Sequence, residues 1–215
     1  MRTRILLVDD HELMRQGLRS ILEGEEDVEI VGEASSGRDA VSLSRTLDPD
    51  VVIMDVGMKD LNGIDATRQI RRELPEVQVI ALSSYSDSRY VSAILEAGAC
   101  GYLLKANAYA DLRKALQAAR QGKNYLCAEV TKGVVDASLH GPRSGVGPSV
   151  LSDREREVLQ LLAEGLTSPQ IGKRLFIATS TVETHRRSIM RKLEIHSVAD
   201  LTKWAIREGL TQLEA

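Results

Sequence analysis

Acidic, hydroxyl and basic side chains stand directly after short apolar runs at four places in the sequence, and together they could bind a phosphoryl group. Asp9 and Asp10 follow the first run, and later runs are followed by Asp55, Ser83 and Lys105. Three carboxylates that lie together repel one another unless a cation sits among them, and Mg²⁺ prefers such oxygen ligands. A hydroxyl and an ammonium group beside them can hold a phosphoryl group on one aspartate, which water can later remove.

Five apolar runs alternate with five helical patterns through the first 121 residues, and they predict the frame that positions these side chains. The runs indicate buried strands at 5–8, 28–31, 51–54, 77–82 and 102–104. Helix-length patterns occupy 12–22, 37–47, 64–74, 89–97 and 108–120. This alternation predicts an α/β domain with a doubly wound, five-stranded parallel sheet. Ligands bind such sheets at the carboxyl ends of the strands, where the reactive side chains fall.

Four motifs at these strand ends resemble the receiver domain of bacterial two-component response regulators. They are ILLVDDH (5–11), VVIMDVGMKDLNG (51–63), ALSS (81–84) and GYLLK (101–105). The resemblance covers roughly residues 1–121 and implies a flavodoxin-like receiver. It implies that Asp55 is the phosphorylated residue and that Ser83 and Lys105 contact the phosphoryl group. It also implies a Mg²⁺ site whose ligands are Asp9, Asp10, Asp55 and the backbone carbonyl of Gly57.

Other roles stay open for several residues of this region. Asp9 and Asp10 could cap the helix that follows them, because aspartate suits that position. By the resemblance Tyr102 is an aromatic switch that turns inward when the strand-end serine moves, but it could equally be a static tyrosine at the core edge. His11 is expected on the surface near the helix start rather than as a phosphoryl carrier. Ala106 stands where many members of the family have proline, so no cis peptide bond is expected there.

A stretch rich in glycine, proline and serine, GPRSGVGPS at 141–149, separates this region from an all-helical one. We predict a receiver at 1–121, a linker at 122–148 with a helix at 128–140, and a second domain at 149–215. Ser152 and Glu155 have the spacing of a capping box, which opens a helix at 153–164. Ser168 is expected to cap a short helix with Pro169 at its first position. Further helices are expected at 180–193 and 198–208.

The helix expected at 180–193 carries an apolar stripe and a basic stripe on opposite faces. At 100° per residue, Val182, Ile189 and Leu193 share one face, and the opposite face holds Thr184, Arg187 and Arg191. A short helix, a turn and such a helix form the helix-turn-helix layout, whose second helix lies in the major groove of DNA. A solvated helix surface would explain the basic stripe as well.

Two longer strings resemble the LuxR-type four-helix DNA-binding domain: LSDREREVLQLLAEGLTSPQIGKRL (151–175) and STVETHRRSIMRKLEIHSVADL (180–201). The resemblance implies contacts to base edges, which suit acidic, hydroxyl and arginine side chains, from Glu183, Thr184 and Arg187. It implies contacts to DNA phosphates from Arg186, Arg191 and Lys192.

The start of the recognition helix departs from the family pattern. Ala178 stands where a capping serine is usual, so we expect the cap to shift to Thr179 or Ser180. In the second case Glu183 could complete a capping box with Ser180 instead of reading a base. The sequence leaves both roles of Glu183 open.

Charge and composition narrow the class of protein. The 28 basic and 31 acidic residues give a net charge of −3, which excludes a protein that coats nucleic acid or membranes by charge alone. Residues 1–140 hold 17 basic and 22 acidic residues, whereas 149–215 hold 10 and 9, so the two parts suggest different tasks. Two cysteines without metal-ligand spacing give neither a disulfide framework nor a zinc site. No apolar run is long enough to span a membrane. We expect a soluble, cytoplasmic protein.

The two resemblances together imply a LuxR-type (NarL/FixJ) response regulator, which we expect to act as a transcription factor rather than an enzyme. A sensor histidine kinase would phosphorylate Asp55 with Mg²⁺ as cofactor, and a homodimer would bind double-stranded DNA, with RNA polymerase as a further partner. Phosphorylation would act by shifting the population of conformations. Two alternatives stay open: a DNA-binding regulator that works without phosphorylation, and an aspartyl-phosphate hydrolase. The hydrolase lacks support, because Asp55 is followed by Val56 and Gly57 and not by the usual DxD pattern.

Overall fold

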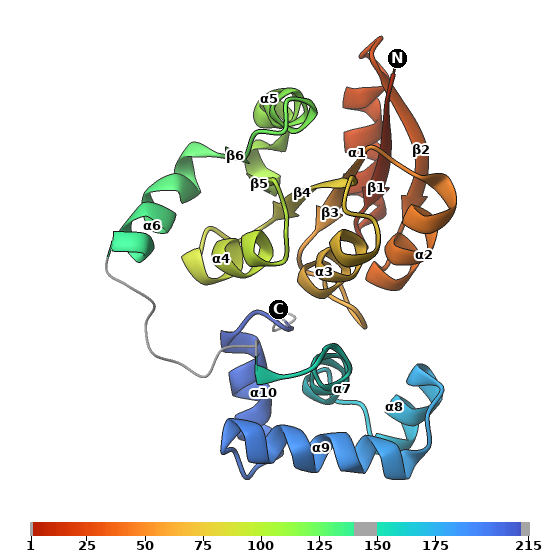
Figure 1. The fold of residues 1–215 in the computed structure, drawn as a ribbon, viewed down its shortest axis with the longest axis vertical. Helices are drawn as coiled ribbons and strands as arrows, with labels where there is room; N and C mark the ends of the chain where they lie inside the picture. Colours follow the sequence, from red (N-terminus) through yellow and green to blue (C-terminus); the bar gives the residue numbers. More distant parts are fainter. Residues whose placement is uncertain (1, 140–149, 212–215) are drawn as a thin grey trace. The chain divides into compact units, whose positions relative to one another are not determined.

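The computed structural model describes residues 2–139 and 150–211, which fall in two compact units, Met1–Pro142 and Arg143–Ala215 (Figure 1). Each unit is described by itself. The strands of the first unit are β1 (Thr3–Val8), β2 (Val28–Ala34), β3 (Val51–Asp55), β4 (Gln78–Ser83), β5 (Gly101–Leu104) and β6 (Tyr125–Leu126). Its helices are α1 (Glu12–Leu22), α2 (Gly37–Leu47), α3 (Gly63–Glu73), α4 (Ser88–Glu96), α5 (Ala108–Arg120) and α6 (Ala128–Leu139).

The sheet is parallel throughout and has the strand order β2-β1-β3-β4-β5-β6. The predicted doubly wound parallel fold is therefore confirmed, but the sheet has six strands and not five. The sixth strand is only two residues long, and Tyr125 N–H donates to the Cys100 carbonyl over 2.9 Å. Two residues are too few to show the alternating pattern by which a strand is recognised in a sequence, so β6 could not be predicted.

Alternating side chains of the central strands feed two separate hydrophobic layers, one on each face of the sheet. Leu6, Val52 and Met54 pack with residues of α2, α3, α4 and α6 on one face. Ile5 and Ile53 pack with α1 and α5 on the other face. Burial on both faces explains why these strands read as continuous apolar runs. The double layer holds the carboxyl ends of β1, β3 and β4 at one fixed edge.

The segment after α5 packs on the first unit. Cys127 is fully buried, Val130 is 1% exposed, and both belong to the layer that covers β3 and β4. Cys127 N–H also donates to the Tyr102 carbonyl over 3.1 Å. The predicted linker at 122–148 thus begins with packed structure, and its predicted helix is α6, with His140 outside the described residues.

The second unit contains α7 (Asp153–Ala163), α8 (Ser168–Leu175), α9 (Thr179–Leu193) and α10 (Val198–Arg207). They enclose one core that includes Val158, Ile171, Val182, Ile189 and Trp204. The predicted all-helical architecture is confirmed. The capping box of Ser152 and Glu155 is present at the start of α7.

Two predicted helix caps of this unit were wrong. Thr167 caps α8 and forms a capping box with Gln170, so Ser168 lies inside the helix. Ala178 occupies the cap position of α9 without any side-chain bond, and the cap does not shift to Thr179 or Ser180. A cap depends on the backbone angles before the helix, and propensity alone did not separate neighbouring hydroxyl residues.

Candidate functional site

The first candidate site lies where β1, β3 and β5 end. The register pairs Val8 with Met54, so Asp9 and Asp55 emerge side by side from neighbouring strands. Both are buried, at 0% and 2% exposure. Lys105 extends between them, with Nζ 2.7 Å from Asp9 Oδ2 and 2.9 Å from Asp55 Oδ2. The structure thus brings together three residues that lie up to 96 positions apart in the sequence.

The charges in this cluster shift one another's ionisation. Burial, together with the neighbouring Asp9 carboxylate, raises the pKa of Asp55 to about 6, although Lys105 and the Gly57 N–H oppose the rise. Burial opposes the charge of Lys105, but the Asp55 and Asp9 carboxylates outweigh it and raise the pKa of the amine. A cation bound beside Asp55 would therefore stabilise the ionised form of this carboxylate.

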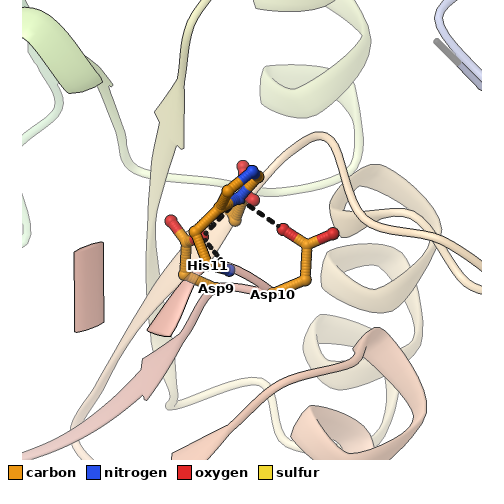
Figure 2. A group of neighbouring side chains, drawn as sticks. Asp9, Asp10 and His11 are labelled. Carbon is orange, nitrogen blue, oxygen red and sulfur yellow. Dashed lines mark hydrogen bonds and ion pairs between the residues drawn. The ribbon is translucent and has the colours of Figure 1, made fainter. Parts of the chain in front are cut away.

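Asp10 and His11 stand at the outer side of the same cluster. Figure 2 shows the imidazole ring turned toward both neighbouring carboxylates, with Nδ1 2.7 Å from Asp10 Oδ1 and 3.2 Å from Asp9 Oδ1. One ligand atom from each of Asp9, Asp10, His11 and Asp55 lies within 4.8 Å of the others. This donor set could hold a divalent cation, and the acidic part of it suits Mg²⁺. Asp9 and Asp10 are not caps of α1, whose cap position is His11 without a side-chain bond.

Gly57 and Gly63 shape the loop that follows β3. The N–H of Gly57 donates to Asp55 Oδ1 over 3.1 Å. Gly63 N–H donates to the Val56 carbonyl over 3.0 Å, and a Cβ at Gly63 would lie 1.9 Å from the Asp55 carbonyl oxygen. Only glycine permits this close approach. We did not single out Gly63 from the sequence, although the motif LNG at 61–63 is a turn signal.

Ser83 and Tyr102 lie beside each other on β4 and β5. The Ser83 hydroxyl is buried and accepts the Tyr85 N–H over 3.1 Å, and the Tyr102 hydroxyl donates to the Tyr85 carbonyl over 2.6 Å. Burial raises the pKa of Tyr102 to about 12, although a hydrogen bond with Ser83 opposes the rise. The ring of Tyr85 stacks on Tyr90 with centroids 5.2 Å apart. Tyr102 therefore points inward and is tied to the same loop as Ser83.

The second candidate site is the outer face of α9. Val182, Ile189 and Leu193 are buried as the periodicity predicted, while Thr184, Arg187 and Arg191 are exposed. The exposed side chains form a continuous face of one polar and two basic groups. Such a face can contact the edges of bases and the phosphates of a nucleic acid.

Lys192, Glu183 and Arg186 are engaged within the second unit. Lys192 Nζ lies 2.6 Å from Glu155 Oε2, and Glu183 accepts a hydrogen bond from the hydroxyl of Ser168. Arg186 Nη1 lies 3.8 Å from Glu183 Oε1. The capping box that we considered for Glu183 is absent, because Ser180 does not cap the helix. The contacts of Lys192 with Glu155 and of Glu183 with Ser168 join different helices, so spacing along the sequence did not indicate them.

Glu155 is the centre of the contact between α7 and α9. Its carboxylate accepts hydrogen bonds from the Ser152 N–H over 2.8 Å and from the Ser188 hydroxyl over 2.7 Å, besides Lys192. Burial opposes its charge, but these donors outweigh burial and lower the pKa of Glu155 to about 2. Lys192 thus has a packing role that its place on the basic helix did not predict.

Comparison with known proteins finds matches for both units. Residues 5–117 match the family described as response regulator receiver domain, and residues 149–205 match the bacterial regulatory proteins of the luxR family. The transcriptional regulatory protein LiaR of Bacillus subtilis (strain 168) is 41% identical over 207 residues, which are 96% of this chain and 98% of LiaR.

Solved structures give the same result. A complex of the two-component response regulator RcsB with DNA is similar with a TM-score of 0.62 and 28% identity, over 97% of this chain and 99% of that one. A structure of two RcsB dimers bound to two parallel DNAs has a TM-score of 0.61 and 29% identity, over 97% and 99%. Among the described residues, no helix is long and apolar enough to cross a membrane.

Proposed function

The chain belongs to the response regulators that join a receiver to a LuxR-family DNA-binding domain, and from this we propose how its residues work. A sensor histidine kinase transfers a phosphoryl group to Asp55, and the phosphorylated protein binds double-stranded DNA and regulates transcription. The observation that supports phosphorylation of Asp55 is its buried carboxylate, which contacts Lys105 and lies close to Asp9 and Asp10.

The acidic cluster is the proposed site of Mg²⁺. Asp9, Asp10 and Asp55 would hold the ion, with the Gly57 carbonyl as a further ligand. Bound Mg²⁺ supplies positive charge that offsets the carboxylates and the incoming phosphoryl oxygens. The raised pKa of Asp55 supports this assignment, because it shows that the ionised carboxylate is disfavoured in the absence of a further cation.

The phosphoryl transfer involves three residues with different roles: Asp55, Lys105 and Ser83. An oxygen of Asp55 attacks phosphorus while the bond from phosphorus to the histidine nitrogen of the kinase breaks, and the electron pair leaves with that nitrogen. The Lys105 ammonium, already 2.9 Å from Asp55, then pairs with a phosphoryl oxygen. The Ser83 hydroxyl moves to bind another phosphoryl oxygen. This movement of Ser83 displaces the backbone of Tyr85, which is hydrogen-bonded to both Ser83 and the Tyr102 hydroxyl, and so alters the position of Tyr102.

The exposed face of α9 is the proposed DNA-reading surface. Thr184 and Arg187 contact base edges, together with Glu183 if its bond to Ser168 opens. Arg191 and Arg186 contact phosphates. The RcsB complexes with DNA support this role, and the RcsB dimers support binding as a homodimer with two recognition helices. We also infer a cytoplasmic protein with RNA polymerase as a further partner.

The test of the phosphoacceptor is chemical labelling of the full chain. Incubation with acetyl phosphate and Mg²⁺ should add about 80 Da, as one phosphoryl group requires, and the adduct should be absent in Asp55→Asn. Lys105→Ala should slow the labelling with Asp55 intact. An unlabelled wild-type protein, or label retained by Asp55→Asn, would overturn the assignment of Asp55.

A further inference from the structure

His11 faces the acidic cluster from the solvent side, and neither the phosphoryl transfer nor the DNA contact uses it. Its side chain is 71% exposed, and its ring is turned toward the carboxylates of Asp9 and Asp10 (Figure 2). The backbone N–H of His11 donates to Asp9 Oδ1 over 2.9 Å, which fixes the residue against the cluster. A nitrogen donor therefore stands beside three carboxylates.

The distances fit ligands of one ion. Two neighbouring ligands of an octahedral ion with bonds of about 2.1 Å lie about 3.0 Å apart. Nδ1 of His11 lies 2.7 Å from one aspartate oxygen and 3.2 Å from the other, values on either side of that spacing. Opposite ligands would lie about 4.2 Å apart, so a spread of up to 4.8 Å needs shifts of a few tenths of an ångström.

Lys105 leaves this side of the cluster free. Its ammonium group contacts the Oδ2 atoms of Asp9 and Asp55. Within the described residues, Asp55 Oδ1 accepts one backbone N–H, from Gly57, and Asp9 Oδ1 accepts the backbone N–H of His11 and contacts the His11 ring. Each carboxylate oxygen has a second lone pair for a cation. A cation can thus bind opposite Lys105 without displacing it.

We propose that His11 is a metal ligand that makes this cluster a binding site for divalent transition-metal ions, such as Co²⁺, Ni²⁺ and Zn²⁺, in addition to Mg²⁺. Imidazole suits these ions, which bind mixed nitrogen and oxygen sites in the Irving–Williams order, whereas Mg²⁺ prefers oxygen. The inference rests on the Mg²⁺ site of the proposed function. It adds that His11 sets which ions compete for that site.

The test measures binding of Ni²⁺ and of Mg²⁺ separately by calorimetry, on the untagged full-length protein. His11→Asn should weaken Ni²⁺ binding about tenfold or more and change Mg²⁺ binding by less than about twofold. His196→Asn replaces an exposed histidine of the second unit and should leave Ni²⁺ binding at this site unchanged. Because the His11 side chain is exposed, its replacement should not unfold the receiver.

A second measurement identifies the ligand directly. The Co²⁺ form should show a strongly shifted imidazole N–H proton resonance that is absent from Co²⁺-loaded His11→Asn and present in His196→Asn. Equal Ni²⁺ affinity of wild type and His11→Asn, or an equal loss of Ni²⁺ and Mg²⁺ affinity, would overturn the role of His11. Failure of the wild type to bind Mg²⁺ would instead contradict the proposed phosphoacceptor site, so the two failures are distinguishable.

Discussion

At the scale of residues, the first candidate site holds the carboxylate of Asp55 in a buried position that disfavours its negative charge. Burial, and after it the neighbouring Asp9 carboxylate, raises the pKa of Asp55 to about 6, because the contact with Lys105 does not fully offset them. The sequence predicted the members of this cluster, because each follows an apolar run and parallel strands bring their carboxyl ends together. It did not predict the orientation of His11, which depends on side-chain angles and not on spacing.

The raised pKa of Asp55 predicts how Asp55→Asn affects stability. The folded protein binds this proton more tightly than the unfolded chain, whose pKa is near 3.8, so the ionised carboxylate costs stability as pH rises from about 4 through 6. In EDTA at pH 7, Asp55→Asn should raise the free energy of unfolding by about 2 kcal/mol, and the gain should vanish near pH 4.

Urea unfolding followed by tyrosine fluorescence reports on the first unit, since all five tyrosines lie there. Glu76→Gln, at an exposed site, serves as the control and should leave stability unchanged at both pH values. An Asp55→Asn protein that is no more stable than wild type at pH 7, or a gain that does not depend on pH, would contradict this account.

The same logic with the opposite sign applies to Glu155. Its pKa is lowered from 4.5 to about 2 by Lys192, Ser152 and Ser188 against the effect of burial, so its stabilising effect is complete above pH 4.5 and is lost as pH falls through 2. Glu155→Gln should lower the free energy of unfolding of the second unit by about 2–3 kcal/mol at pH 7 and by much less near pH 3.

Trp204 fluorescence in urea measures this, because the tryptophan is buried in the core of that unit. Glu194→Gln, which changes an exposed carboxylate at the end of α9, is the matched control. Equal stability of Glu155→Gln and Glu194→Gln at pH 7 would refute the role assigned to Glu155.

At the scale of elements, the helix ends of the second unit depart most from what the sequence suggested. Two non-glycine residues end helices with left-handed backbone angles: Phe176, with φ 54° and ψ 43°, and Glu194, with φ 55° and ψ 34°. The Phe176 side chain is 95% exposed, so little packing offsets the strain. Propensity placed the helices themselves well, since long amphipathic patterns are read from many residues. Caps and the two-residue β6 depend on one or two residues and on tertiary contacts.

Relief of this strain should stabilise the second unit. Phe176→Gly should raise its free energy of unfolding by about 0.5–1 kcal/mol, since glycine adopts positive φ freely but adds entropy to the unfolded chain. Gly165→Ala is the converse control: φ is 88° and nothing lies within 4 Å of the added Cβ, so only backbone strain changes, and stability should fall. Thermal unfolding of both variants checks this, and a loss of stability in Phe176→Gly would show that the exposed ring packs favourably.

Neighbouring basic residues of α9 should behave differently on DNA. Arg191 is exposed, whereas Lys192 is paired with Glu155. Arg191→Gln should reduce the slope of log affinity against log salt by about 1, as expected when one phosphate contact is lost. Lys192→Gln should leave that slope unchanged and lower the stability of the second unit instead. Binding isotherms at several salt concentrations measure both slopes. A reduced slope for Lys192→Gln with an unchanged slope for Arg191→Gln would show that Lys192, and not Arg191, contacts a DNA phosphate.

At the scale of the whole molecule, two units with different charges share one chain. The first unit holds three of its aspartates at the proposed phosphoacceptor and metal site, and the second unit exposes Arg187 and Arg191 on the outer face of α9. The net charge of −3 is thus a sum over two functions and describes neither. The sequence predicted this division from the linker composition, but it did not predict that β6 and α6 pack on the first unit. Their packing depends on the edge of β5 and on the face of α4, which only the fold brings together.

The central claim is that a phosphoryl group on Asp55 changes DNA binding by the second unit. The most direct measurement is the affinity of the full-length protein for a duplex that it selects from a random pool, before and after labelling with acetyl phosphate and Mg²⁺. We predict that labelling tightens binding by about tenfold, a typical coupling between two sites, and that Asp55→Asn does not respond. Equal affinity of labelled wild type, unlabelled wild type and Asp55→Asn would contradict the account and establish a regulator that works without phosphorylation.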